Sequence, residues 1–263
     1  MTELLAPAKI NLALVVGPRR PDGRHEVSTV MQRISLADRI ALERSDALEV
    51  TGFEEDTIVR AALTALAEAV GRQPSWRVRI EKQIPVAAGL GGGSSDAAAA
   101  LRLANDSLAR PLAEADLRSI ASSIGADVPF FLTAGPQLGE DDGTTLEPLE
   151  LTQDYWVLLL LPTNERKAST GDVYERFSNE DGFPERRAAV RQAVALGSLT
   201  GLPPNDLASS PLSDELLTHG AFRADVSGAG PTVYGLFEEQ SEAVAALAAL
   251  SDRGRAWIAT PAW

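Results

Sequence analysis

A glycine-rich segment followed directly by an alanine run is the part of this sequence best suited to chemistry. Its residues are Pro85-Val86-Ala87-Ala88-Gly89-Leu90-Gly91-Gly92-Gly93-Ser94-Ser95. The alanine run behind it predicts a helix from Asp96 to about Leu108, whose unpaired N–H groups and positive dipole end would face the glycines. Glycines let the backbone approach a ligand closely, and the two serines add hydroxyl donors. The pattern therefore predicts a phosphate-binding loop.

Other interpretations of this segment are weaker. A loop that needs only flexibility does not usually place glycines and serines directly before a strong helix former. A Walker A motif ends in Gly-Lys-Ser/Thr, and this segment contains no lysine. In a dinucleotide-binding fingerprint the third glycine would fall on Ser94, and Asp116 lies in a helical pattern where an acid at a strand end is required.

Lys9, Asn11 and Asp127 are the side chains that could act on a phosphoryl group. Lys9 and Asn11 interrupt the apolar segment 4–17, and alternation along a strand sends both to one face. Phosphoryl transfer needs a group that accepts the hydroxyl proton and a cation near the moving phosphate. Asp127 and Lys9 could provide these. The alternatives are a solvent-facing lysine on an edge strand and a turn or cap aspartate.

These residues must be positioned by a mixture of strands and helices, without regular alternation, which predicts an α+β protein with lobes 1–150 and 151–263. Apolar and alternating stretches predict strands over 4–17, 33–43, 47–52, 76–82, 128–133 and 155–161, and a strand-turn-strand pair over 225–237. Helical spacing predicts helices over 56–70, 112–123 and 241–250, one opening near 170 and one around 213–217, whereas 182–204 reads as irregular.

Composition excludes several classes of function. The net charge of −13 argues against a nucleic-acid partner or an anionic membrane surface, although Arg19, Arg20, Arg24 and His25 form one local basic cluster. That cluster could meet an anionic ligand or be a solvated turn. The chain has no cysteine, which excludes disulfides and thiolate chemistry. The first residues contain no secretory signal pattern, and the expected location is cytoplasmic.

Separated motifs, in order along nearly the whole chain, are similar to those of the GHMP kinases, the superfamily of galactokinase, homoserine kinase, mevalonate kinase and phosphomevalonate kinase. Within it, the closest likeness is to the kinases of the non-mevalonate isoprenoid route, which act on a cytidine diphosphate derivative. The motifs are Pro7-Ala8-Lys9-Ile10-Asn11-Leu12, Asp22-Gly23-Arg24-His25, Pro85 to Ser95, Gly125-Ala126-Asp127-Val128-Pro129, Pro204-Asn205-Asp206-Leu207 and Val226 to Tyr234.

The resemblance implies a two-lobe α+β kinase, with an N-terminal lobe like ribosomal protein S5 domain 2 and a ferredoxin-like C-terminal lobe. It implies that Asp127 is the base, that Lys9 orients the substrate hydroxyl, and that the loop Pro85 to Ser95 binds ATP. Asn11, Arg24 and His25 would bind the substrate, with His25 hydrogen-bonded to cytosine. Mg²⁺ would bridge the ATP phosphates, with Ser95 as its protein ligand.

Arg24 stands where this group of kinases usually has a tyrosine that stacks on the cytidine. A guanidinium can stack on a base or pair with a phosphate. Two alternatives therefore stay open. One is a GHMP-type kinase that acts on homoserine, a sugar or a mevalonate-like alcohol. The other is a nucleotide-binding protein without catalysis, which would have no need of both Lys9 and Asp127.

Overall fold

The computed structural model describes residues 1–163, 170–178 and 181–262, and these form two compact units. The first unit contains residues 1–8, 36–86 and 91–134, and the second contains 9–35, 87–90 and 135–263. These units are interleaved along the chain, whereas the predicted lobes are consecutive. The division into lobes 1–150 and 151–263 stays a prediction.

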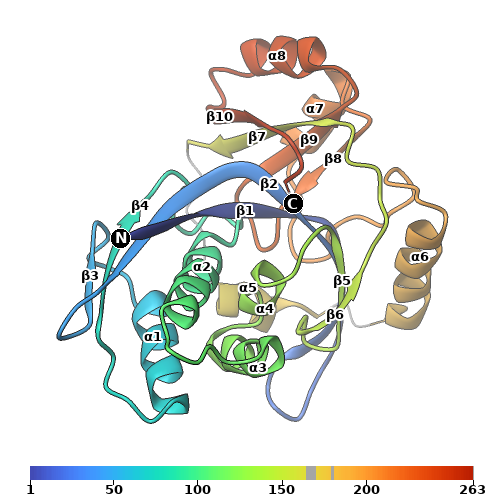
Figure 1. The fold of residues 1–263 in the computed structure, drawn as a ribbon. Helices are drawn as coiled ribbons and strands as arrows, with labels where there is room; N and C mark the ends of the chain where they lie inside the picture. Colours follow the sequence, from blue (N-terminus) through green and yellow to red (C-terminus); the bar gives the residue numbers. More distant parts are fainter. Residues whose placement is uncertain (164–169, 179–180, 263) are drawn as a thin grey trace. The chain divides into compact units, whose positions relative to one another are not determined.

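The first unit packs four helices beside a group of strands (Figure 1). Strand β4 (Trp76–Glu81) pairs in parallel with β3 (Glu49–Thr51) and antiparallel with residues 39–44 of β2 (His25–Arg44). Alternate β4 residues are buried and exposed, as the sequence alternation predicts. The helices are α1 (Ile58–Ala69), α2 (Gly92–Asp106), α3 (Glu114–Ile124) and α4 (Val128–Phe131), and α1, α3 and α4 all contact α2.

The second unit is built on two groups of strands. In one, residues 29–31 of β2 pair with β5 (Gln137–Glu140), which pairs with β6 (Thr145–Pro148), and β1 (Thr2–Arg19) pairs with β2. The other is an antiparallel sheet in the order β10-β7-β9-β8. Its strands are β7 (Trp156–Pro162), β8 (Arg223–Val226), β9 (Val233–Phe237) and β10 (Gly254–Ala259).

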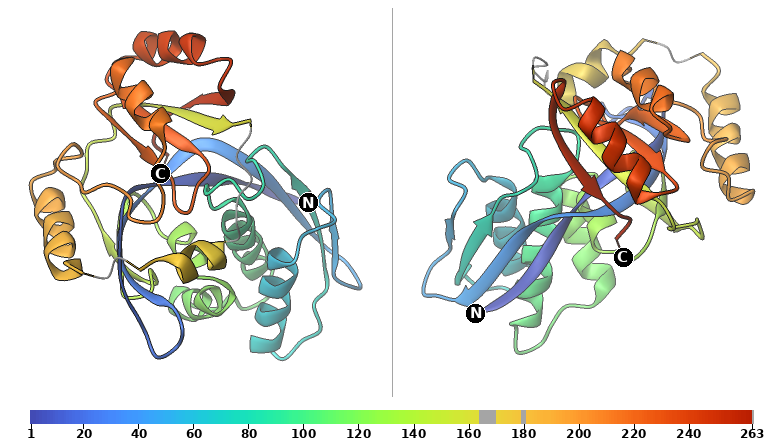
Figure 2. Two further views of the ribbon diagram at one scale, coloured as in Figure 1. Left: turned by 180° about the vertical axis from the view of Figure 1, so that it is seen from behind. Right: turned by 90° about the horizontal axis from the view of Figure 1, so that it is seen from above.

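Helices α7 (Pro211–Thr218) and α8 (Gln240–Ala249) cover one face of this antiparallel sheet, and α8 is the red helix in Figure 2. Leu216 of α7 and Ala243 and Ala246 of α8 share a buried cluster with Leu158 and Phe237 of the sheet. Among the described residues of the second unit, the other helices are α5 (Thr170–Arg176) and α6 (Phe183–Ala195).

The α+β class predicted from the sequence is confirmed, but three local predictions were wrong. Residues 128–131 form helix α4 where a strand was expected, since Pro129 would cost a strand one ladder hydrogen bond but is tolerated in a first helical turn. Helix α6 occupies the stretch expected to be irregular, because Gly182 and Pro184 mark its start. Helix α2 begins at Gly92, four residues before the predicted Asp96.

Among the described residues, no helix combines the length and the apolar character that crossing a membrane requires.

Candidate active site

The second half of the glycine loop is the first turn of α2. Gly91 is the N-cap residue with a φ of 69°, a left-handed conformation that glycine adopts at little cost. The Ser95 N–H donates to the Gly91 carbonyl at 2.9 Å, so the amides of Gly92, Gly93 and Ser94 precede the first intrahelical hydrogen bond. Glycine at 92 and 93 leaves the helix start without side chains, and the free amides suit an anion.

The Ser95 hydroxyl is a buried oxygen at this helix start that a ligand could use. Ser95 is 1% exposed, and its Oγ has no hydrogen-bond partner among the described residues. A buried hydroxyl without a partner is costly unless a ligand uses it. This observation fits the predicted contact of Ser95 with a phosphate or its metal ion. The described residues contain no cluster of three or more His, Asp or Glu side chains suited to a metal.

A lysine that the sequence analysis missed holds the two sides of this loop in the first unit. Lys82, one residue after β4, donates to Asp38 at 2.5 Å and to Asp96 in α2 at 2.7 Å. Asp38 is fully buried and also accepts the backbone N–H of Ile84 at 2.8 Å. The sequence did contain a signal for this lysine. It ends the strict alternation of 76–82, and an aspartate lies in the next predicted helix.

Burial and charge change the protonation behaviour of this cluster. Burial raises the pKa of Asp96 to about 7; Lys82 opposes this shift, and the neighbouring Asp38 carboxylate adds to it. Burial lowers the pKa of Lys82, but Asp96 and Asp38 together outweigh it and the pKa is raised. A charged Lys82 therefore bridges the strand before the loop and the helix after it.

Lys9 and Asn11 lie together in the second unit, as strand alternation predicts. Each is 4% exposed, and the Lys9 ammonium donates to the Asn11 side-chain oxygen at 2.5 Å. The Asn11 amide donates to Thr29 Oγ1 at 2.8 Å, and Thr29 donates to the Ala13 carbonyl at 2.8 Å. Lys9 is therefore a buried strand lysine with an oriented ammonium group, and the solvent-facing alternative is wrong.

The first half of the glycine loop and the third glycine motif meet at this lysine. The Lys9 backbone N–H donates to the Leu90 carbonyl at 2.9 Å, and Ser227 Oγ donates to the Gly89 carbonyl at 3.0 Å. A Cβ on Gly89 would lie 2.2 Å from the Ser227 carbonyl oxygen, so only glycine fits there. A Cβ on Gly228 would lie 3.3 Å from Lys9 Nζ. The motif at 226–234 is therefore packed against the loop and against Lys9.

Asp127 belongs to the first unit, where it is half-buried and immediately precedes α4. Its φ of −82° and ψ of −14° continue into the helix, and its side chain makes no capping hydrogen bond. The carboxylate is therefore at a helix start, whereas the sequence placed it before a strand. Lys9 and Asn11 belong to the other unit, and the meeting of Asp127 with them stays a prediction.

His25 lies in an aromatic environment in the second unit. It is 8% exposed, and its Nδ1 is 2.9 Å from the Gly17 carbonyl oxygen. The rings of Tyr174 and Phe177 each lie with their centroids 5.9 Å from that of His25. The sequence analysis missed both aromatic residues, although their i, i+3 spacing at the end of a predicted helix could have identified them. Flat apolar surfaces beside a ring nitrogen are suited to a planar base.

The arginines near His25 are paired locally. Arg24 contacts Asp142 at 2.5 Å with about half of its side chain exposed, and Arg20 contacts Asp22 at 3.3 Å. Arg19 donates to the Gly23 carbonyl at 3.1 Å. Burial acts to raise the pKa of Asp142, but hydrogen bonds from Thr144 and Arg24 lower it overall. These contacts fit the solvated-turn interpretation of the basic cluster.

Comparison with known proteins covers the whole chain. The models for the GHMP kinases N terminal domain and the GHMP kinases C terminal domain match residues 56–135 and 209–256. A 4-diphosphocytidyl-2-C-methyl-D-erythritol kinase of Citrifermentans bemidjiense is 38% identical over 98% of this chain and 96% of that protein. The enzyme of the same name from Nocardia farcinica is 38% identical over 95% of this chain and 89% of its own length.

Solved structures agree with these matches. A crystal structure of 4-(cytidine 5'-diphospho)-2C-methyl-D-erythritol kinase aligns over 100% of both chains, with a TM-score of 0.82 and 32% identity. Homoserine kinase from Cytophaga hutchinsonii covers 98% of this chain and 94% of its own, with a TM-score of 0.77 and 16% identity, which is a likeness of fold.

Proposed function

Since this chain belongs to the 4-diphosphocytidyl-2-C-methyl-D-erythritol kinases within the GHMP kinase family, we propose that it transfers the γ-phosphoryl group of ATP to the 2-hydroxyl of that cytidine diphosphate alcohol. The observation that carries the proposal is the sequence identity of 38%, over 98% of this chain, with an enzyme of this name. The buried Lys9 beside the glycine motifs and the His25 aromatic site support it within the second unit.

For the nucleotide, the loop Pro85 to Ser95 would bind the ATP phosphates through the amides at the start of α2 and the Ser95 hydroxyl. Ser95 is also the proposed protein ligand of Mg²⁺, which when bound would neutralise phosphate charge. Two observations support this assignment: the Ser95 Oγ has no hydrogen-bond partner among the described residues, and glycines occupy the start of α2 at 91–93.

For the chemical step, Asp127 would accept the proton of the substrate hydroxyl as its oxygen attacks the γ-phosphorus, and ADP would leave. Lys9, held by Asn11, would orient that hydroxyl and balance the negative charge that develops. Asn11 would line the same site. These roles stay proposals.

For the substrate base, His25 would hydrogen-bond the cytosine, with Tyr174 and Phe177 offering ring faces. Those two rings provide an aromatic surface that does not depend on a tyrosine at position 24. Arg24 would act at the rim of the site, where it is paired with Asp142.

An ADP-release assay over a panel of alcohols tests the substrate. We expect turnover with the cytidine diphosphate alcohol and little with homoserine, galactose or mevalonate. Preference for one of those three would favour the alternative of a GHMP-type kinase with another small alcohol. ATP binding without turnover on any of them would favour the non-catalytic nucleotide binder.

A further inference from the structure

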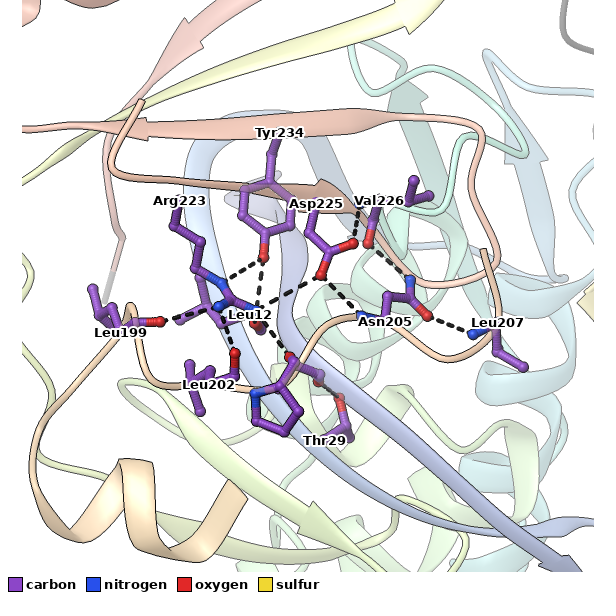
Figure 3. A network of polar contacts seen from close by, with 12 residues as sticks. Leu12, Thr29, Leu199, Leu202, Asn205, Leu207, Arg223, Asp225, Val226 and Tyr234 are labelled. Carbon is purple, nitrogen blue, oxygen red and sulfur yellow. Dashed lines mark hydrogen bonds and ion pairs between the residues drawn. The ribbon is translucent and has the colours of Figure 1, made fainter. Parts of the chain in front are cut away.

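Asn205 in the second unit uses its backbone N–H and both ends of its side-chain amide in hydrogen bonds, two of which hold the turn at Val226 to Gly228. It is 8% exposed, and its side-chain amide donates to the carbonyls of Val226 at 2.8 Å and Gly228 at 2.7 Å. Its side-chain oxygen accepts from the Leu207 N–H at 2.8 Å, and its own N–H donates to Asp225 at 2.9 Å. Figure 3 shows Asn205 between Asp225, Val226 and Leu207. Among uncharged side chains, only those of asparagine and glutamine supply two N–H donors and a carbonyl acceptor, and glutamine is one carbon longer.

The turn that Asn205 holds packs directly on Lys9. Gly228 has a φ of +58°, and a Cβ there would lie 3.3 Å from Lys9 Nζ, from Asn11 Oδ1 and from the Gly89 carbonyl oxygen. The next residue back, Ser227, donates to that same Gly89 carbonyl. The Gly228 backbone therefore limits where the Lys9 ammonium can lie, and Asn205 fixes the Gly228 carbonyl.

The strand that carries Lys9 is braced from the same segment. Arg223 and Tyr234 both donate to the Leu12 carbonyl, at 2.5 Å and 3.3 Å (Figure 3). Arg223 also donates to the Pro203 carbonyl at 3.0 Å. Asp206, next to Asn205, donates its N–H to the Leu14 carbonyl at 2.9 Å and accepts from the Val16 N–H at 2.9 Å. Residues 203–206 thus connect β1 with the turn that contacts its lysine.

We propose that Asn205 is a positioning residue for Lys9: by binding the carbonyls of Val226 and Gly228, it holds the turn that sets the position of the ammonium in the phosphoryl transfer. The inference rests on the proposed role of Lys9. It assigns a function to Asn205 in the Pro204-Asn205-Asp206-Leu207 motif, a residue to which the proposed function gives no role.

The test is a double-mutant cycle between Asn205→Asp and Lys9→Ala, measured as kcat for ADP release at saturating substrates. Asn205→Asp keeps the size of the side chain but replaces the donating amide with a carboxylate oxygen, which repels the carbonyl oxygens of Val226 and Gly228. We expect kcat to fall about 10- to 100-fold, because small displacements of a reacting group are costly. In the Lys9→Ala background the same change should have little further effect, since the group that it positions is gone.

Asp206→Asn is the matched control. It makes the reverse exchange, carboxylate to amide, at the adjacent residue. The change weakens the hydrogen bonds that the Asp206 carboxylate accepts from the Val16 N–H and, at 3.1 Å, from Arg186 Nε, but it does not touch the Gly228 turn. We expect the unfolding free energy to fall while kcat stays near that of the wild type, because the substitution keeps the backbone hydrogen bond to Leu14 and on β1 alters only the contact with Val16, farther along that strand from Lys9. If Asn205→Asp does not fold, Asn205→Ala enters the same cycle, because it removes the donors without adding a charge.

The outcomes separate the inference from its premise. Two results would overturn the positioning role while leaving the kinase assignment intact. One is a double variant whose fold loss in kcat equals the product of the two single losses; the other is a kcat that Asn205→Asp does not change. Equal kcat losses for Asn205→Asp and Asp206→Asn would indicate a merely structural role and also overturn it. A Lys9→Ala enzyme with wild-type kcat overturns the proposed role of Lys9 itself.

Discussion

The ammonium of Lys82 lies 2.7 Å from the Asp96 carboxylate, so an ion pair links the strand before the glycine loop to the helix after it. The same ammonium contacts the fully buried Asp38. Two buried carboxylates thus depend on one cation.

Lys82→Met should destabilise the first unit by roughly 3 kcal/mol, because removing one partner leaves buried charge uncompensated. Urea unfolding at neutral pH measures the change. Arg77→Met is the control in β4, the strand that precedes Lys82. Arg77 makes exposed pairs with Glu43 and Glu49, so its loss should have little effect. Equal losses in the two variants would contradict the role of the buried cluster.

Asp127→Asn should lower kcat by about 10²- to 10⁴-fold, the usual contribution of a general base, while ATP still binds. Single-turnover kinetics and calorimetric ATP binding provide the two measurements. Asp116→Asn, an acid on the preceding helix, is the control and should keep its activity. Near-normal turnover by Asp127→Asn would remove this residue from the mechanism.

Phe177→Leu should raise KM for the cytidine substrate roughly 10-fold, in line with the usual loss of an aromatic stacking surface, and leave KM for ATP unchanged. Steady-state kinetics with each substrate varied in turn measures both constants. Phe222→Leu removes another aromatic contact, to Tyr155, and should change neither KM. If KM for the cytidine substrate does not respond to Phe177, the base does not bind at His25.

Gly89→Ala should weaken ATP binding and destabilise the protein, because the new methyl would meet the Ser227 carbonyl at 2.2 Å. Gly135→Ala is the control, since Gly135 has a similar φ of +68° but open space within 4 Å. The control carries the backbone cost alone, about 1 kcal/mol. Similar ATP affinities for the two variants would argue against contact between the loop and the third motif.

Asp142 should stabilise the protein in a pH-dependent manner. Its pKa is lowered in the folded state, so its contribution is complete above the unfolded value near 3.9 and is lost as the pH falls through the folded pKa. Urea unfolding of wild type and Asp142→Asn should therefore differ most at about pH 6, and the difference should shrink as the pH falls below the unfolded value. A difference that grows toward acid would show the opposite sign and refute the assignment.

Much of the fold was predictable because several elements have one clear period. The strict alternation of 76–82 gave β4, and the apolar spacing of 56–70 gave α1, since one face of each is buried. The β5 strand was missed because all four of its residues are buried although two are polar. Glu140 is tolerated there because Arg187, Arg191 and Ser28 compensate it, and these partners lie far away in sequence.

The candidate site was partly predictable for a similar reason. The glycine loop and Lys9 carry local signals, namely an alanine helix behind glycines and a charge inside an apolar strand. Lys82 and Asn205 carry weaker signals. The partners that define their roles lie 14 and 44 positions away for Lys82 and 20 to 23 positions away for Asn205. Helix α6 was hidden because Gly182 and Pro184 resemble loop residues until their helix-start geometry is seen.

The interleaving of the two units sets a limit on how this enzyme can be dissected. Each unit draws on three separate stretches, and one of them is only the four residues 87–90. No single cut of the gene would release either unit intact, so fragment complementation or lobe exchange with a relative would break both at once. The ligand-binding role of each unit should instead be tested in the intact polypeptide, one substitution at a time.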